Sequence, residues 1–207
     1  MEFCGVREQF GFTNRPQSKL PMLDPTWYFD GDLPGLSDAT VDATIQAALS
    51  TWSKRCRPVW SKAATMASAT LKIITTRIDG PLNILADCEF PYPGMRQILM
   101  RLDMEKFTTA FNPGPNYLGL PHVVAHEGGH AMGVFHLADD STPDLMNARY
   151  NARIWEPQDD DAAIVLQLYG PPLAIIPQPT PPIPGMKSIN VNVEQDGKKW
   201  SGSIPRI

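Results

Sequence analysis

The chain has 207 residues, a length that fits one ordinary domain. Hydrophobic residues make up 43% of it and charged residues 19%, a composition typical of a folded protein that buries a core. The formal net charge of -4 provides no basic field, which argues against nucleic acid or an anionic membrane as a partner. No stretch approaches the apolar length of a membrane span, and the first twenty residues show no signal peptide.

The first part of the chain predicts strands and one helix. A strand at 27–29 precedes an apolar stripe whose members recur every three or four positions. This stripe predicts a helix that Ser37 or Thr40 caps and that a following proline ends. Cys56 falls on the stripe, so we expect a buried thiol there. Another strand is expected at 70–77, where apolar residues alternate.

Two further strands and two further helices are expected before the chain becomes rich in proline. The strands, 83–90 and 96–102, flank a Pro-Tyr-Pro-Gly turn. A short helix begins near Pro121 and ends before Gly133, a residue that suits a left-handed C-terminal cap. The last helix follows Pro157, and three aspartates in its first turn complement the helix dipole.

The end of the chain has a different composition. Seven of the fourteen residues from 171 to 184 are proline, which favours an extended linker. Residues 185–207 alternate apolar and polar side chains around an Asp-Gly pair, a pattern typical of a β-hairpin. So short a segment cannot hold a core alone, so the hairpin lies on the main domain, pairs with a partner, or begins a further module.

All four histidines of the chain fall within fifteen residues. The sequence His-Glu-Gly-Gly-His places His126 and His130 on one helical face, close enough to bind one metal ion. Gly133 lets the backbone leave the helix, so that His136 can return as a third ligand. Three neutral imidazoles leave a fourth position on zinc for water, and Glu127 is placed to take its proton. The set predicts a catalytic zinc site, since a structural zinc usually has a fourth protein ligand.

The spacing His-Glu-x-x-His-x-x-Gly-x-x-His resembles the signature of the metzincin zinc peptidases, in which a methionine turn follows. Met146 resembles the methionine of that turn. The segments 83–86 and 103–108 and the string Leu-Tyr-Gly-Pro-Pro at 168–172 are similar to the catalytic domain of matrix metalloproteinases, the matrixins. The resemblance divides the chain into an N-terminal segment (1–19), a catalytic domain (20–170), a linker (171–184) and a hairpin-like tail (185–207).

The resemblance implies an α+β fold of the metzincin/matrixin type, with a twisted, mostly parallel sheet, one antiparallel edge strand and three helices. Residues 83–87 would form that edge strand, beside which an extended protein or peptide substrate would lie as an added strand. The family positions that line the pocket for the residue after the scissile bond correspond to His122 and Tyr150. His122 could narrow this pocket, restrict it to medium-sized apolar side chains, be an ordinary hydrogen-bonded helix residue, or bind a stray metal ion.

We expect this chain to bind fewer metal ions than matrixins usually do. Matrixins carry a structural zinc and calcium ions in a long loop before the edge strand, but only residues 79–82 separate Ile78 from Asn83 here. Asp87 and Met100 stand where histidines would bind the structural zinc, and Leu102 replaces a calcium-binding acid. We therefore expect one catalytic Zn²⁺, no structural zinc and no structural calcium.

The triplet Cys-Gly-Val at 4–6 resembles the core of the family's cysteine switch, in which an N-terminal thiolate binds the open zinc position and keeps the enzyme latent. The flanks differ, because Phe3 replaces an arginine and Arg7 and Glu8 replace proline and aspartate. Cys4 is therefore either an inhibitory zinc ligand or an ordinary thiol on a frayed terminus.

Taken with the motif, the resemblance implies a secreted, monomeric, zinc-dependent endopeptidase that hydrolyses extended protein substrates, with Glu127 as its catalytic base. The enzyme would be a zymogen if Cys4 enforces latency. Because no signal peptide is visible, an intracellular or viral setting stays open. The alternative function is a non-catalytic peptide-binding or interaction module that retains a zinc site and has no need of Glu127.

Overall fold

The computed structural model describes residues 3–4, 18–79, 83–104, 107–110, 118–137, 142–173, 188–195 and 198–205. The chain forms two compact units, Met1–Leu173 and Ala174–Ile207. Within the described residues, no helix has both the length and the apolar character needed to cross a lipid bilayer.

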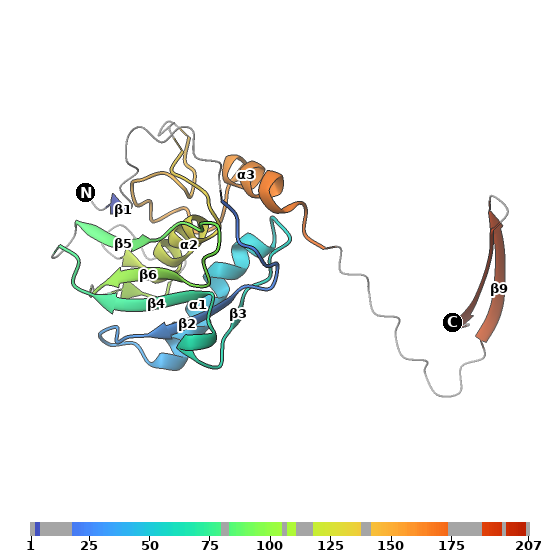
Figure 1. Cartoon of the computed structure of the whole chain (residues 1–207), viewed down its shortest axis with the longest axis horizontal. Helices are drawn as coiled ribbons and strands as arrows, with labels where there is room; N and C mark the ends of the chain where they lie inside the picture. The colour runs from blue at the N-terminus through green and yellow to red at the C-terminus, as the bar shows by residue number, and fades with distance from the viewer. Residues whose placement is uncertain are drawn as a thin grey trace. The chain divides into compact units, whose positions relative to one another are not determined.

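The first unit is built on a six-stranded sheet in the order β1-β5-β6-β4-β2-β3 (Figure 1). The central strands β2 (Thr26–Asp30), β4 (Leu71–Thr76) and β6 (Ile98–Asp103) run parallel to one another. The two-residue strand β3 (Ser61–Lys62) adds to β2 in the same direction. In contrast, β5 (Ile84–Cys88) is antiparallel to β6. The mostly parallel sheet with an antiparallel strand near its edge is thus confirmed.

The outer edge of β5 is covered by the N-terminal part of the chain. The strand β1 (Phe3–Cys4) pairs parallel with β5, with Cys4 opposite Ala86. On its other side, the backbone N–H of Cys4 donates to the carbonyl of Ala148 at 3.2 Å. A segment of the chain itself therefore lies at the edge where the sequence led us to expect a substrate strand.

Two helices cover one face of the sheet (Figure 1). The helix α1 (Asp38–Ser53) begins at Ser37, whose side chain accepts a backbone N–H of the first turn. The helix α2 (Leu120–Ala131) is joined to α1 where Trp52 donates its indole N–H to the carbonyl of Ala125 at 2.7 Å. The predicted apolar stripe is buried in α1 and just beyond its end: Val41, Ile45, Ala48, Leu49, Trp52 and Cys56.

The hydrophobic core lies between the sheet and these helices. Leu71 and Ile73 of β4 and Met100 and Leu102 of β6 are completely buried, and the residues between them are partly exposed. This alternation follows the strand pattern of the sequence. Met100 and Leu102, at two of the positions where the family binds further metal ions, are core residues here.

The third helix, α3 (Asp159–Tyr169), is tied to two distant segments by one hydroxyl group. The hydroxyl of Tyr169 accepts the N–H of Leu20 at 2.9 Å and donates to the carbonyl of Met132, at the end of α2, at 2.7 Å. The remaining elements of this unit are short: the 3₁₀ helix Met66–Ser68, β7 (Phe107–Thr108) and β8 (Leu118–Gly119).

The second unit contains two antiparallel strands, β9 (Ser188–Gln195) and β10 (Lys198–Pro205), where the sequence predicts a hairpin. The expected Asp-Gly turn at 196–197 lies outside the described residues, and so does most of the proline-rich linker, from residue 174 onward.

Candidate metal site and substrate cleft

Three histidines and one cysteine converge beside α2. The Nε2 atoms of His126 and His136 are 3.3 Å apart, and those of His130 and His136 are 3.2 Å apart. The thiol sulfur of Cys4 lies 3.4 Å from Nε2 of His130. All four ligand atoms lie within 4.8 Å of one another, so the cluster could hold one metal ion.

Backbone carbonyls orient the two helical histidines. Nδ1 of His126 lies 2.6 Å from the carbonyl oxygen of Leu145, and Nδ1 of His130 lies 2.7 Å from that of Val134. Because a carbonyl can only accept, Nδ1 carries the proton and Nε2 keeps its lone pair for the cluster. Burial lowers the pKa of His126 to about 3 and also lowers the pKa of His130. Both rings are therefore held neutral, the form that binds metal.

The turn that returns His136 to the cluster depends on Gly133. Its φ is +89°, a backbone conformation that favours glycine. In addition, a Cβ at this position would lie 2.2 Å from the carbonyl oxygen of Ser18. The N–H of Gly133 donates to the carbonyl of His130 at 2.8 Å, which closes the last turn of α2. The positive φ expected from the sequence is present, and a tertiary contact adds a second requirement for glycine.

Met146 packs directly against α2 between the histidines. Its side chain is completely buried, and its sulfur would be 2.4 Å from a Cβ on Gly129. The same Cβ would be 2.7 Å from the ring of Trp52. A glycine within a helix costs about 0.5–1 kcal/mol relative to alanine. Here the missing side chain lets a methionine and a tryptophan pack against the helix beside His126 and His130.

Glu127 is only 1% exposed, and its Oε2 atom has no hydrogen-bond partner among the described residues. Burial raises the pKa of this carboxyl to about 8, although a hydrogen bond with the Cys4 thiol opposes the rise. A buried polar atom without a partner is costly, and a metal ion with its water beside Glu127 would satisfy it. Imidazole nitrogens and a thiolate are ligands that zinc prefers, so these residues fit Zn²⁺.

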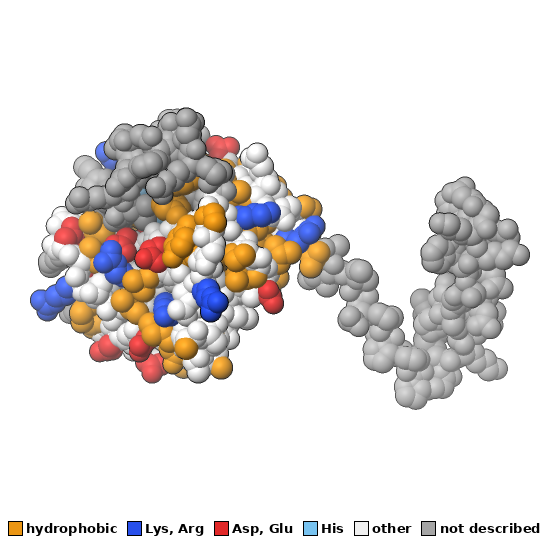
Figure 2. Space-filling model, viewed as in Figure 1, with side chains coloured by type: hydrophobic (Ala, Val, Ile, Leu, Met, Phe, Trp, Pro, Cys, Tyr) orange, Lys and Arg blue, Asp and Glu red, His pale blue; other side chains and the backbone are white. Residues whose placement is uncertain are grey.

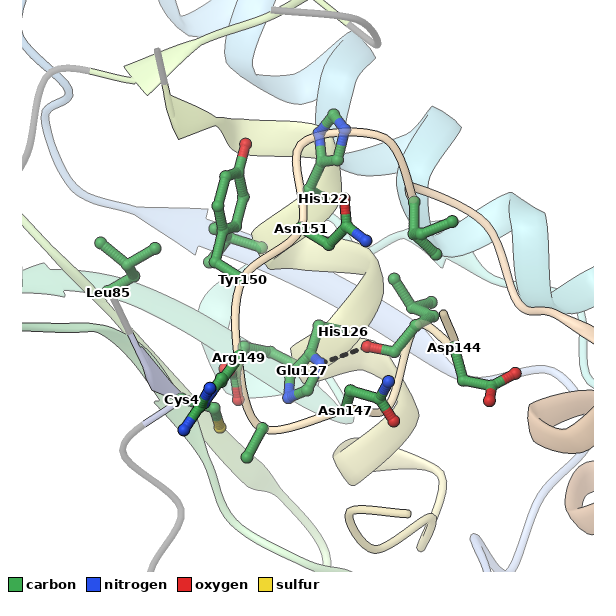
Figure 3. A pocket seen from close by; sticks show the side chains of 14 residues that line it. Cys4, Leu85, His122, His126, Glu127, Asp144, Asn147, Arg149, Tyr150 and Asn151 are labelled. Carbon is green, nitrogen blue, oxygen red and sulfur yellow. Dashed lines mark hydrogen bonds between the residues drawn. The ribbon is translucent and has the colours of Figure 1, made fainter. Parts of the chain in front are cut away.

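A cavity opens beside the cluster (Figure 3). His122 and Tyr150 lie at the end away from Cys4. His122 has its Nε2 atom 2.9 Å from the carbonyl of Ala152, and the hydroxyl of Tyr150 accepts the N–H of Gly119 at 2.8 Å. Burial lowers the pKa of His122. His122 is therefore a hydrogen-bonded helix residue that also lines the cavity.

Two neighbours of the predicted residues also belong to this region. Asn147 and Arg149 line the cavity in the segment between Met146 and Tyr150. No motif of the sequence points to these two residues, although their place between two expected site residues is a signal. Of the segment expected to form the cysteine switch, Cys4 lies in the cluster, and residues 5–8 lie outside the described residues.

The sequence predicts that Asp161 complements the helix dipole, but this side chain is completely buried. Its carboxylate accepts the backbone N–H groups of Leu145, Met146 and Gln158 at 2.9, 3.1 and 2.8 Å. Asp161 therefore holds the methionine turn. The position in the first turn of a helix did not reveal this role, because the partners come from another segment.

Asp87 and Met100 are the two positions where matrixins have histidines that bind the structural zinc. Here the carboxylate of Asp87 forms an ion pair. It lies directly opposite Arg101 in the ladder between β5 and β6. The guanidinium of Arg101 donates to both carboxylate oxygens, with Nε 2.7 Å from Oδ1. This hydrogen bonding raises the pKa of Arg101. A cross-strand ion pair thus stands at this position.

The sequence of this chain is similar to that of a known protein family. The family model of the matrixins matches residues 19–170. Human matrix metalloproteinase-20 is 28% identical over an alignment of 191 residues, and the match covers 86% of this chain and 38% of that protein. Human matrix metalloproteinase-27 is 29% identical over 180 residues (81% and 33%), and rat (Rattus norvegicus) stromelysin-1 is 31% identical over 183 residues (82% and 37%). The chain spans well under half of the length of these relatives. It belongs to the matrixin family.

Proposed function

We propose that this chain is a zinc-dependent endopeptidase that hydrolyses peptide bonds in extended protein substrates. Membership of the matrixin family supports a metalloprotease. The observation that carries the proposal is the convergence of His126, His130 and His136 beside the buried carboxyl of Glu127. Zinc held by the three imidazoles would supply a Lewis acid that polarises the scissile carbonyl and lowers the pKa of water to about 7.

Glu127 acts as the general base and then as the general acid. Its Oε2 atom takes the proton of the attacking water and passes it to the nitrogen of the leaving amine. The position of Glu127 supports this role, because it directly follows His126 in α2 and is buried beside the three imidazoles. The carbonyls of Leu145 and Val134 keep the rings of His126 and His130 in position while the proton moves.

The substrate lies extended between β5 and the segment 147–150. β1 supports this placement, because it makes backbone contacts to Ala86 on one side and to Ala148 on the other. An added strand gains affinity from such main-chain hydrogen bonds. The residue after the scissile bond enters the cavity end formed by His122 and Tyr150. The contacts of these two side chains with Ala152 and Gly119 close that end, which favours a medium-sized apolar side chain.

Cys4 makes the uncut chain latent. Its sulfur lies among the metal-ligand atoms, where a thiolate would take the zinc position that water needs.

We further propose that the chain binds one catalytic zinc and no structural zinc or calcium, and that it is a monomer that works outside the cell. Its catalytic domain spans 20–170 and is followed by a linker (171–184) and a hairpin tail (185–207).

The test is cleavage of a denatured protein by the zinc-loaded chain carrying Cys4→Ala, compared with the same chain carrying also Glu127→Gln. Loss of the general base reduces the rate by about 10² to 10⁴-fold while zinc content and circular dichroism stay unchanged. Glu156→Gln, which removes a carboxylate from an exposed ion pair with Lys54, is the matched control and retains the rate. If the Cys4→Ala chain binds zinc and never cuts, the protein is the non-catalytic interaction module instead.

A further inference from the structure

The cleft carries an accessible positive charge that the reaction itself does not use. Among the residues that line the cavity, Glu127, Asp144 and Arg149 have formally charged side chains. Glu127 and Asp144 are buried, and the carboxylate of Asp144 accepts a hydrogen bond from the hydroxyl of Thr142. Arg149 is exposed, and no lysine or other arginine is among the described residues of the lining. The accessible charge of the described cleft is therefore that of a guanidinium.

Arg149 lies on the wall that an extended peptide would contact. It directly follows Ala148, whose carbonyl accepts the N–H of Cys4 at 3.2 Å. It directly precedes Tyr150, whose hydroxyl is bonded to the N–H of Gly119 at the closed end of the cavity. Figure 3 shows the ring of Tyr150 extending toward that end, and Arg149 and Cys4 both line the same cavity. Arg149 is thus an exposed residue of the cavity lining, one position before the residue that closes the end of the cavity.

This position and charge point to a specificity role. We propose that Arg149 selects substrates with an acidic side chain at the second or third residue after the scissile bond. The inference rests on the proposed function, since it assigns the cavity end at Tyr150 to the first residue after that bond. The next substrate residues then pass the neighbouring wall position. A guanidinium fork binds a carboxylate through two hydrogen bonds, which makes arginine the suited partner for aspartate or glutamate.

The expected preference is moderate because the pair is exposed to solvent. Exposed ion pairs are worth about 0.2–1 kcal/mol, so an acidic residue should raise kcat/KM about 1.4- to five-fold over its uncharged amide. A lysine at the same place should lower it further, because like charges repel. Both effects should weaken at high ionic strength, since the screening length falls to about 3 Å in 1 M salt.

The experiment uses the full chain carrying Cys4→Ala, loaded with zinc, and a peptide series with Asp, Asn or Lys at the second and third positions after the scissile bond. The ratio of kcat/KM for the Asp and Lys peptides is measured for this chain and for added Arg149→Ala and Arg149→Glu. We expect Arg149→Ala to bring the ratio close to one and Arg149→Glu to invert it. Arg153→Ala is the control, because Arg153 is exposed in the same loop but does not line the cavity.

An Asp-to-Lys ratio that Arg149→Ala leaves unchanged, or that Arg153→Ala reduces equally, overturns the inference. If no peptide is cut by any variant, the proposed function fails.

A binding measurement tests the role of Arg149 independently of cleavage. Fluorescence anisotropy measures the affinity of labelled Asp and Lys peptides for the zinc-loaded chain carrying Cys4→Ala and Glu127→Gln. Tighter binding of the Asp peptide that is lost in Arg149→Ala supports the inference, and equal affinities reject it.

Discussion

The carboxylate of Asp161, in the first turn of α3, accepts the backbone N–H of Met146 at 3.1 Å. Its other oxygen accepts the N–H groups of Leu145 and Gln158. The carbonyl of Leu145 in turn orients the ring of His126. Burial raises the pKa of Asp161, and the three hydrogen bonds oppose the rise. One buried side chain of α3 is therefore coupled to the position of a histidine in the Cys4–His126–His130–His136 cluster.

Asp161→Asn should weaken both the fold and the metal site. An amide has one oxygen and one NH2 group, so it cannot accept all three N–H groups, and at least one of them loses its partner. We expect a loss of about 1–3 kcal/mol in the free energy of unfolding, measured by urea titration of the metal-free protein. Zinc affinity should fall about 10- to 100-fold in a competition assay with a chelator.

Asp160→Asn is the control for this experiment, because the neighbouring side chain is exposed. Its effect on the free energy of unfolding should stay within about 0.5 kcal/mol. Equal effects of the two substitutions would show that Asp161 contributes only its charge near the helix end.

Gly133→Ala should cost more stability than Gly35→Ala. The two glycines have similar φ values, +89° and +83°, so alanine meets the same backbone penalty of about 1–2 kcal/mol at both. A Cβ at Gly35 meets nothing within 4 Å, whereas a Cβ at Gly133 meets the backbone of Ser18 at 2.2 Å. We expect a further loss of about 1–3 kcal/mol at Gly133 from this overlap.

The measurement is chemical unfolding of both variants, together with zinc affinity. Because the turn at Gly133 directs His136 to the cluster, only Gly133→Ala should also weaken zinc binding. Indistinguishable unfolding midpoints for the two variants would mean that the overlap with Ser18 does not affect the stability of the fold.

Cys4→Ala should increase the peptidase activity of the freshly purified, uncleaved chain. The reason is that the thiol lies among the metal-ligand atoms and would take the position needed by water. A fluorogenic peptide provides the rate. Cys56→Ala is the matched control, because the Cys56 thiol is buried and burial raises its pKa to about 12, which keeps it protonated. Unchanged activity in Cys4→Ala means that latency does not depend on this residue.

Zinc analysis should give one ion per chain. The three imidazoles of the cluster form one site. Asp87 stands where matrixins have a structural-zinc ligand, and it is held by Arg101 instead. Asp87→Asn should therefore leave the zinc content at one and lower the free energy of unfolding by about 0.5–1 kcal/mol, since the pair is partly exposed. Atomic absorption after dialysis measures the ratio. Two zinc ions per chain, or a melting temperature that calcium raises, would refute the reduced metal content.

The helices and the longer strands were predictable because their signals are local. The three- and four-residue spacing of the stripe in α1 and the alternation in β4 follow from the geometry of a single element. The shared face of His126 and His130 follows from the same helical period, and the positive φ of Gly133 follows from glycine's place after the helix. The two-residue strands β1, β3, β7 and β8 were not predicted, since two residues show no periodicity.

Other features depend on residues that are far apart in the sequence. The contact of Cys4 with His130 spans 126 positions, and the bond between Trp52 and Ala125 spans 73. The reach of Asp161 to the methionine turn and the place of Arg149 beside the groove likewise required the folded chain. Composition and spacing specify which side chains a helix or a turn presents. Which distant backbone or side-chain group they meet is decided by packing, because such contacts form only when the sheet and the helices assemble.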